Sequence, residues 1–226
     1  MPEFNKLPAY TGNTMSYAGI GSRRTGDAID PDSKRPILEI MEELATELES
    51  LGYTLNSGHA DGPDQAFEKG VKEDSHKQIF LKSNATSRTY KIAREVHANW
   101  KALSAYAKGL QARNTFQVFG RDLDKPVDFV LCYTPDGAEN DPRTGATEHL
   151  TGYNRPGIPN TGGTGQAISM ASMKGIPVIN MANPGWRARL DAILAQSKQY
   201  EHESYEYMED SGISGVLSEQ PYEDRI

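Results

Sequence analysis

Cysteine is almost absent from this sequence of 226 residues, which contains only Cys132. A single cysteine excludes an intramolecular disulfide and agrees with a reducing compartment. No run reaches the about 20 apolar residues that a membrane span needs. No apolar run follows charged residues at the N-terminus, so we expect no signal peptide. The sequence therefore predicts a soluble, cytoplasmic protein without contact to a membrane.

An excess of positive charge is also missing. The net charge is −7, and residues 200–226 carry eight acids and one base, so this tail accounts for the whole net charge. The rest of the chain is neutral and lacks the basic footprint of a strong non-specific nucleic-acid binder. An acidic tail near a phosphate site would also repel DNA. Single-stranded DNA is therefore a disfavoured partner.

Metal-ligand spacing and the common catalytic motifs are lacking as well. The five histidines follow no metal-binding pattern, and Cys132 has no second cysteine beside it, so we expect no metal site. The sequence contains neither a Gly-x-Ser-x-Gly elbow nor a Walker motif. Cys132 ends an apolar run and is expected to be a small core residue. We expect no bound cofactor.

Segments of strand length alternate with segments of helical period along the chain. We expect strands at 17–20, 53–56, 79–81, 127–133 and 176–180, and helices at 36–51, 64–71, 163–174 and 184–197, with one or two more between 86 and 119. This alternation predicts an α/β fold with a Rossmann-like, doubly wound, mainly parallel sheet and helices on both faces. The expected organisation is an N-terminal arm over 1–14, this domain over 15–199 and an acidic C-terminal tail over 200–226. The long stretch 134–161 has no period and is expected to be functional or disordered.

Three glycine-rich loops follow predicted strands, where open parallel sheets bind their ligands. In the first loop, Gly19 and Gly21 would let backbone amides approach a phosphate, Ser22 could donate a hydrogen bond and Arg23 could supply charge. A tight turn with solvated arginines explains the same residues equally well.

The second loop begins with Ser57 and Gly58 and enters a helix at Asp64. Asp64 could be a simple helix N-cap. Asp61 stands earlier in the turn and is better placed to meet a ribose hydroxyl or a base amine.

The third loop opens the helix at 163–174. Several small residues at a helix N-terminus predict a nest of backbone amides for an anion. Its members are Gly162, Gly163, Thr164, Gly165 and Gln166. Arg113 and Asn114, in contrast, lie within a helical run, and their pattern alone predicts a solvated helix face.

These loops, in this order, resemble the SLOG superfamily, and within it the Rossmann-like core of the DNA-processing family DprA (Smf). The residues that carry the resemblance are Tyr17-Ala-Gly-Ile-Gly-Ser-Arg-Arg24, Leu55-Asn-Ser-Gly-His-Ala-Asp-Gly-Pro-Asp64, Arg113-Asn114, Gly162-Gly-Thr-Gly165 and Gly175-Ile-Pro-Val-Ile179. It covers about residues 15–182. The superfamily also contains the LOG-type nucleoside-monophosphate phosphoribohydrolases and sensors of nucleotide-derived signals. The resemblance implies that Arg113 and Asn114 stand in the ligand cleft.

The sequence departs from both activities of this superfamily at one position each. Where the DprA pattern has a basic residue that helps to hold DNA phosphates, this chain has Asp61, which would repel them. Where the LOG pattern has a glutamate that acts at the glycosidic bond, this chain has Ile168 or Ser169. The resemblance thus implies that the phosphate-binding loops are present, but it implies neither of the two activities intact.

We therefore expect a nucleotide-binding, SLOG-like homo-oligomer whose partner is a nucleotide or a nucleotide-derived small molecule. If the protein is an enzyme, N-glycosidic chemistry on a nucleotide is expected, and Asp61, Asp64 or Glu148 would have to replace the missing glutamate. Two alternatives stay open: a DprA-like single-strand DNA-binding recombination mediator, and a non-catalytic sensor or sequestering protein for a nucleotide signal. Single-strand binding needs aromatics in a basic groove, but Tyr90, Trp100, Tyr106 and Phe116 have helical spacing that is more typical of a core.

Overall fold

The computed structural model describes residues 15–23, 25–97, 99–139 and 163–197 of the chain. The chain forms two compact units, Met1–Trp186 and Arg187–Ile226. The described residues of the second unit, 187–197, are helical. An ion pair between Arg187 Nε and Asp191 Oδ1, 2.9 Å long, spans one turn of this helix.

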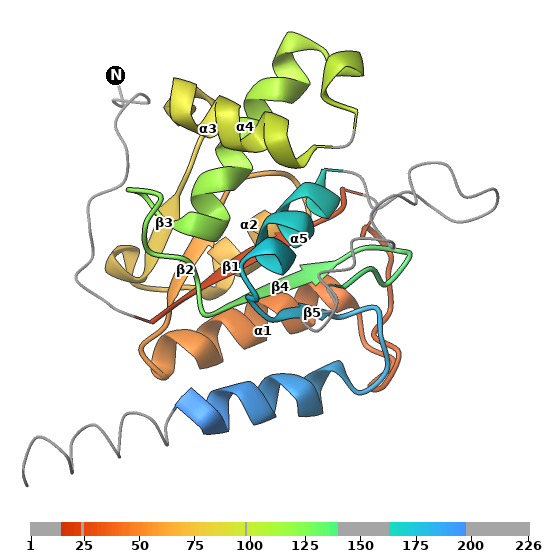
Figure 1. Ribbon diagram of the computed structural model, residues 1–226. Helices are drawn as coiled ribbons and strands as arrows, with labels where there is room; N and C mark the ends of the chain where they lie inside the picture. The colour runs from red at the N-terminus through yellow and green to blue at the C-terminus, as the bar shows by residue number, and fades with distance from the viewer. Residues whose placement is uncertain (1–14, 24, 98, 140–162, 198–226) are drawn as a thin grey trace, which may run out of the picture. The chain divides into compact units, whose positions relative to one another are not determined.

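Five parallel strands form the sheet at the centre of the first unit (Figure 1). They are β1 (Ser16–Gly21), β2 (Thr54–Ser57), β3 (Lys77–Ile79), β4 (Phe129–Tyr133) and β5 (Val178–Asn180). Their order in the sheet is β3-β2-β1-β4-β5, and every neighbouring pair runs parallel. The chain moves outward from β1 first on one side and then on the other, so the strand order reverses between β1 and β4. This is the place at which open α/β sheets bind ligands.

Helices connect the strands and cover the sheet. They are α1 (Ile37–Ser50), α2 (Pro63–Gly70), α3 (Ser87–Val96), α4 (Ala105–Phe119) and α5 (Thr164–Met173). Short 3-10 turns lie at Asp74–His76, Lys82–Asn84 and Trp100–Ala102. Thr86 and Ser104 cap α3 and α4 by accepting hydrogen bonds from the first-turn amides of Thr89 and Ala107. Gly52, at φ 85°, follows α1 in the left-handed region that glycine adopts most readily.

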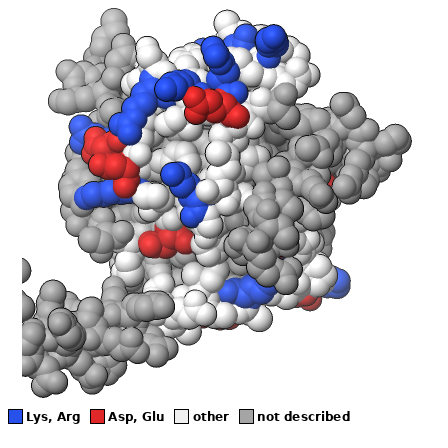
Figure 2. Space-filling model, viewed as in Figure 1, with Lys and Arg blue, Asp and Glu red and all other residues white. Residues whose placement is uncertain are grey.

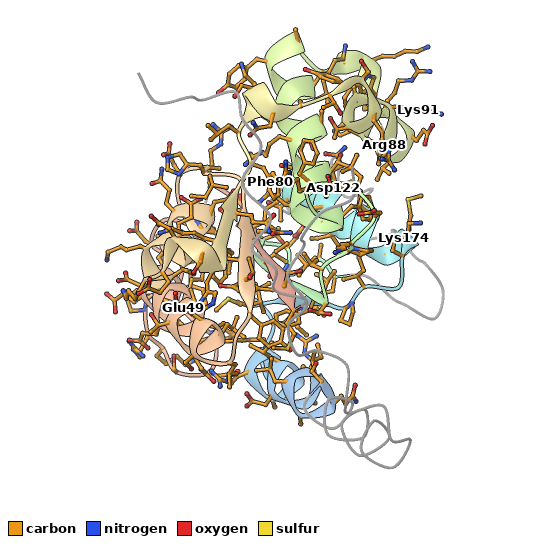
Figure 3. The ribbon with its side chains drawn as sticks, turned by 90° about the vertical axis from the view of Figure 1, so that its left-hand side faces the viewer. Glu49, Phe80, Arg88, Lys91, Asp122 and Lys174 are labelled. Atoms are coloured by element: carbon orange, nitrogen blue, oxygen red, sulfur yellow. The ribbon has the colours of Figure 1, made fainter. Side chains whose placement is uncertain are left out.

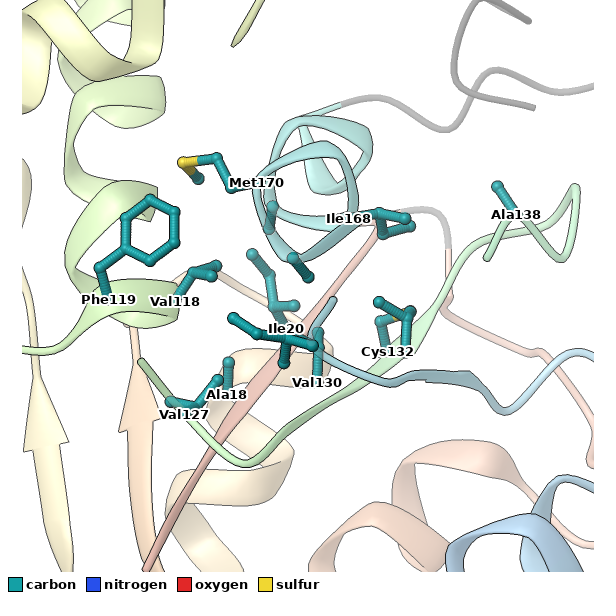
Figure 4. Packing of buried hydrophobic residues seen from close by; sticks show 14 residues of the cluster. Ala18, Ile20, Val118, Phe119, Val127, Val130, Cys132, Ala138, Ile168 and Met170 are labelled. Carbon is teal, nitrogen blue, oxygen red and sulfur yellow. The ribbon is translucent and has the colours of Figure 1, made fainter. Parts of the chain in front are cut away.

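Apolar side chains fill both faces of the sheet because successive strand residues point to opposite sides. On the side of α2, Tyr17 packs edge-on against Phe67 and stacks on Phe129, with ring centroids 6.1 and 5.8 Å apart. On the side of α4 and α5, Ala18 and Ile20 join residues of β4, β5 and both helices in a buried cluster (Figure 4). We call this second group the α5-side core. The predicted Rossmann-like α/β fold with helices on both faces is confirmed.

Three expectations about single elements were wrong. The third strand lies at Lys77–Ile79 and not at 79–81, although the Phe80 amide still donates to Ser57 O. Of the aromatics expected in the core between 86 and 119, Phe116 is buried, but Tyr106 is 63% exposed. The expected solvated face of α4 at Arg113 and Asn114 is buried, because α4 packs against α3, α5 and the sheet. No helix in the described part of the chain has the length and apolar character to cross a membrane.

Candidate functional site

A cleft of about 680 Å³ opens at the carboxyl ends of β1 and β2, where the strand order reverses. The start of α2, the middle of α4 and the start of α5 complete its walls. The polar residues that line it are Ser22, Arg23, His59, Asp61, Asp64, Tyr106, Gln111, Arg113, Asn114 and Thr164. The fold thus brings together residues from all three predicted loops and from the Arg113-Asn114 pair.

The first loop forms the floor of the cleft next to β4. The Ser22 amide donates to Tyr133 O over 2.9 Å and so links the ends of the two central strands. A Cβ on Gly21 would lie 2.5 Å from the Pro63 ring, so only glycine lets α2 start this close to β1. Arg23 is exposed at the cleft and can reach a ligand from the solvent side.

The second loop is shaped around the Arg113 side chain. A Cβ on Gly58 would lie only 1.1 Å from Arg113 Nη1, so the guanidinium occupies the space that any other residue's side chain would fill. Arg113 itself is 4% exposed. The glycine at this position is therefore a packing requirement of the arginine as well as a feature of the loop.

Arg113 is buried with an incomplete set of partners. Its Nη1 lies 3.6 Å from Asp64 Oδ2, which is ion-pair distance but beyond a hydrogen bond. Neither Nε nor Nη1 finds a hydrogen-bond acceptor among the described residues. Burial lowers the pKa of Arg113 from its ordinary value, while the neighbouring carboxylates oppose that shift. A buried arginine has five N–H donors, so this one can still bind an anionic acceptor in the cleft.

Asp64 is buried at the start of α2 and is not a helix N-cap, because Gly62 holds that position. Its Oδ2 accepts from the amides of Gly58 and Ala60, over 3.2 and 3.4 Å, and thereby fixes the second loop. Desolvation raises the pKa of Asp64 to about 6, although Arg113 and the two amides act in the opposite direction. Asp61 is exposed at the cleft, where it accepts from Gln65 Nε2.

A second carboxylate below the same loop was missed by the sequence analysis. Glu68 on α2 is buried and accepts from Ser57 Oγ over 2.5 Å and from the His59 amide over 3.0 Å. It also bonds to His59 Nδ1 over 2.6 Å. The spacing of His59 and Glu68, nine residues across a loop-to-helix junction, carries no recognised motif that could have revealed the pair.

The amino end of α5 closes the cleft opposite these loops. Gly163 is the N-cap residue, and no side chain among the described residues caps the helix. Asn114 Nδ2 donates to Gly163 O over 3.3 Å and ties α4 to this end. First-turn amides without a side-chain acceptor can bind an anion. Gly163 and Thr164 line the cleft.

Several residues that the sequence predicts to bind the ligand lie outside the cleft. Gly19 lies within β1, where a Cβ would meet the Phe67 ring, and Ser57 is bound to Glu68 below the cleft. Gly165 and Gln166 are buried within the first turn of α5, and Gln166 Nε2 donates to Ala93 O. None of these four residues lines the cleft. Arg24, Glu148 and Gly162 lie outside the described residues.

Within the described ranges, no group of three or more His, Cys, Asp or Glu side chains could hold a metal ion. Comparisons with protein-family models, with curated proteins and with solved structures found no match to this chain.

Proposed function

We propose that this protein binds a phosphate-bearing nucleotide in the cleft at the ends of β1 and β2. The phosphate lies between the amino end of α5, the Ser22 region and the guanidinium groups of Arg23 and Arg113. The sugar or base lies toward Asp61. The observation that carries the proposal is Arg113: a buried guanidinium at the wall of a cleft whose Nε and Nη1 have no hydrogen-bond acceptor among the described residues.

Burial physics explains why this observation supports an anionic ligand. Leaving a buried polar group unpaired costs about 1–3 kcal/mol, and more when the group is charged. A ligand phosphate that reaches the guanidinium would supply acceptors in addition to the carboxylate of Asp64, and arginine matches phosphate geometry well. The cleft volume of about 680 Å³ falls in the range usual for small-molecule sites. The resemblance to the SLOG superfamily points to the same ligand class.

Two experiments test binding. The purified protein would be denatured and any released nucleotide identified by mass spectrometry. Gly163→Val would then test the cradle, because a side chain at the N-cap of α5 covers its first-turn amides. Gly26→Val is the matched control, since a Cβ at Gly26 meets no atom within 4 Å. We expect the Gly163 variant to lose nucleotide binding with an apo melting temperature within a few degrees of wild type. Unchanged binding would place the phosphate elsewhere.

Catalysis is a separate part of this proposal. N-glycosidic cleavage needs a carboxylate near the anomeric carbon, and the cleft offers Asp61 and Asp64. Acid–base assistance is typically worth about a hundredfold or more. We expect common nucleoside monophosphates to bind and to release base slowly or not at all, as in a sensor or sequestering protein. Rapid base release, followed by chromatography, would contradict this, and Asp61→Asn, Asp64→Asn and Glu148→Gln would identify the acid.

One surface favours single-stranded nucleic acid as a second candidate ligand. Between Phe80 and Phe119 the chain carries one acid, Glu95, and six Lys or Arg besides the buried Arg113. Figure 2 shows several of these cations gathered where Figure 1 places α3 and α4, and Figure 3 shows Arg88 and Lys91 together. Lys82 Nζ lies 4.1 Å from the centre of the Tyr106 ring, which lines the cleft. Aromatic and basic side chains side by side are typical of single-strand binding.

Fluorescence anisotropy with labelled oligonucleotides separates the two candidates. We expect weak binding at physiological salt, in about the micromolar range or weaker, which is usual for non-specific contacts. Sub-micromolar affinity that falls in Arg88→Glu and Lys91→Glu would favour the nucleic-acid candidate. Deleting residues 200–226 and replacing Asp61 by Arg tests whether the tail or Asp61 opposes DNA. The predicted homo-oligomer is tested in the same samples by light scattering.

A further inference from the structure

One buried carboxylate, that of Glu68, bonds to both the backbone and the side chain of His59 in the cleft. Glu68 is 9% exposed and bonds both to the backbone amide and to Nδ1 of His59, while the imidazole itself is 54% exposed and lines the cleft. The backbone of His59 stands at φ 57°, in the left-handed region that non-glycine residues rarely adopt. Such strain persists where surrounding contacts enforce it, and it is concentrated at functional sites.

The Glu68 contact determines which nitrogen of the ring carries the proton. A carboxylate has no proton to donate, so Nδ1 must donate to Glu68 Oε2. In the neutral ring, Nε2 then keeps its lone pair and is a hydrogen-bond acceptor. Nε2 has no partner among the described residues. The neighbouring cleft groups are Asp61 and Asp64 from the second loop and α2, and Tyr106 and Arg113 from α4.

We propose that His59 Nε2 is a ligand-contacting acceptor that selects nucleotides presenting a hydroxyl or amino donor at this point. Glu68 is the positioning residue that fixes the ring and its tautomer. This inference rests on the proposed function, since it names a specificity contact within the same cleft. The donor has two sources in a nucleotide, the sugar hydroxyls and an exocyclic amine of the base, and both present an N–H or O–H group to the same acceptor.

The test uses calorimetric binding of four probes to the full chain. The probes are adenosine 5′-monophosphate, its 2′-deoxy and 2′,3′-dideoxy forms, and inosine 5′-monophosphate, which lacks the amino group. The variant is His59→Asn, because asparagine tolerates a positive φ and its amide can still donate to Glu68. His76→Asn is the matched control: His76 also lies near a carboxylate, 3.6 Å from Glu49, but outside the cleft.

Losing one hydrogen bond is expected to weaken adenosine monophosphate binding about fivefold to tenfold in His59→Asn and not at all in His76→Asn. The analogue without the recognised donor should bind wild type and His59→Asn equally. If wild type and His59→Asn have equal affinity for the deoxy probes, the donor is a sugar hydroxyl. If they have equal affinity for the inosine probe, the donor is the amine. If wild type binds and His59→Asn matches it on all four probes, this inference is wrong while the proposed function stands. If wild type binds none of them, the proposed function itself fails.

Glu68→Gln tests the tautomer independently of any ligand. A glutamine amide can donate to Nδ1 and so move the ring proton to Nε2, which converts the acceptor into a donor. Long-range ¹H–¹⁵N spectra at alkaline pH should show His59 protonated at Nδ1 in wild type and at Nε2 in Glu68→Gln. Protonation at Nε2 in wild type would overturn the inference.

Discussion

The cleft and the α5-side core are both built on β1, but their buried atoms differ in kind. The core is apolar and continuous from β1 and β4 to α4 and α5, as Figure 4 shows for Ile20, Val118 and Ile168. The polar part of α4, from which Gln111 and Arg113 line the cleft, contains buried polar atoms without hydrogen-bond partners in the described structure. These atoms belong to Gln111, Arg113, Thr115 and Gln117.

One helix therefore serves both regions: α4 is polar where it meets the cleft and apolar at Val118 and Phe119 near its end. Apolar burial stabilises the fold, whereas unpaired buried polar groups oppose folding. The apolar core therefore supplies stability, whereas the buried polar atoms of α4 lower it, as the proposed ligand site would lead us to expect. The following substitutions are ordered by the size of the effect on the free energy of unfolding.

Ile168→Ala should give the largest loss. Ile168 is fully buried in the α5-side core, and truncating such a residue costs about 2–5 kcal/mol because a cavity remains. Nucleotide affinity of the folded variant should be unchanged. Urea denaturation measures the loss, and Ile29→Ala, at a side chain that is 50% exposed, is the control with little expected change. A loss below 1 kcal/mol, as an order-of-magnitude threshold, would show that this core is loosely packed.

Gly58→Ala should disturb the wall of the cleft at Arg113, on the helix that the cleft and the core share. The new methyl group would collide with Arg113 Nη1, and the required displacement is expected to cost about 1–3 kcal/mol. The same displacement should abolish phosphate binding. Gly26→Ala, where a Cβ meets nothing within 4 Å, should change neither quantity. A Gly58 variant with wild-type stability would mean that Arg113 leaves its buried position without a penalty.

Asp64→Asn should change the pH dependence of stability. The pKa of Asp64 is raised from 3.8 to about 6, so the folded chain binds this proton more tightly than the unfolded chain does. The free energy of unfolding of wild type should therefore fall as the pH rises from about 4 to about 6, relative to the variant, by about 1–3 kcal/mol. Denaturation curves of both proteins across this range measure the difference. Parallel pH profiles would contradict the raised pKa.

Gln117→Leu should change the free energy of unfolding least, and its effect should be stabilising. The side chain is fully buried, and neither amide atom has a partner in the described structure. Its removal should stabilise the fold by about 1 kcal/mol. Gln166→Leu is the matched comparison, because Gln166 Nε2 does donate to Ala93 O and its loss should destabilise. Destabilisation of both variants would indicate that Gln117 is hydrogen-bonded after all.

The sequence predicted the fold and the three loops better than the surroundings of single residues. Periodicity located α1 and β4 because one apolar stripe or run dominates each. The edge strand β3 was placed two residues late because it begins with Lys77 and Gln78. Arg113 could not be recognised as buried from the sequence pattern, since its burial depends on α4 being covered by α3, α5 and β2 together. The same holds for His59 and Glu68, which meet only through the turn into α2.

The central claim is that buried Arg113 binds a nucleotide phosphate. Calorimetry with adenosine 5′-monophosphate and adenosine, on wild type and on Arg113→Met, tests it most directly, with folding checked by circular dichroism. The account predicts that the variant binds the monophosphate about ten- to a hundredfold more weakly, as expected for lost hydrogen bonds to a charged group, and binds adenosine as wild type does. Equal affinity of both proteins for the monophosphate would contradict it.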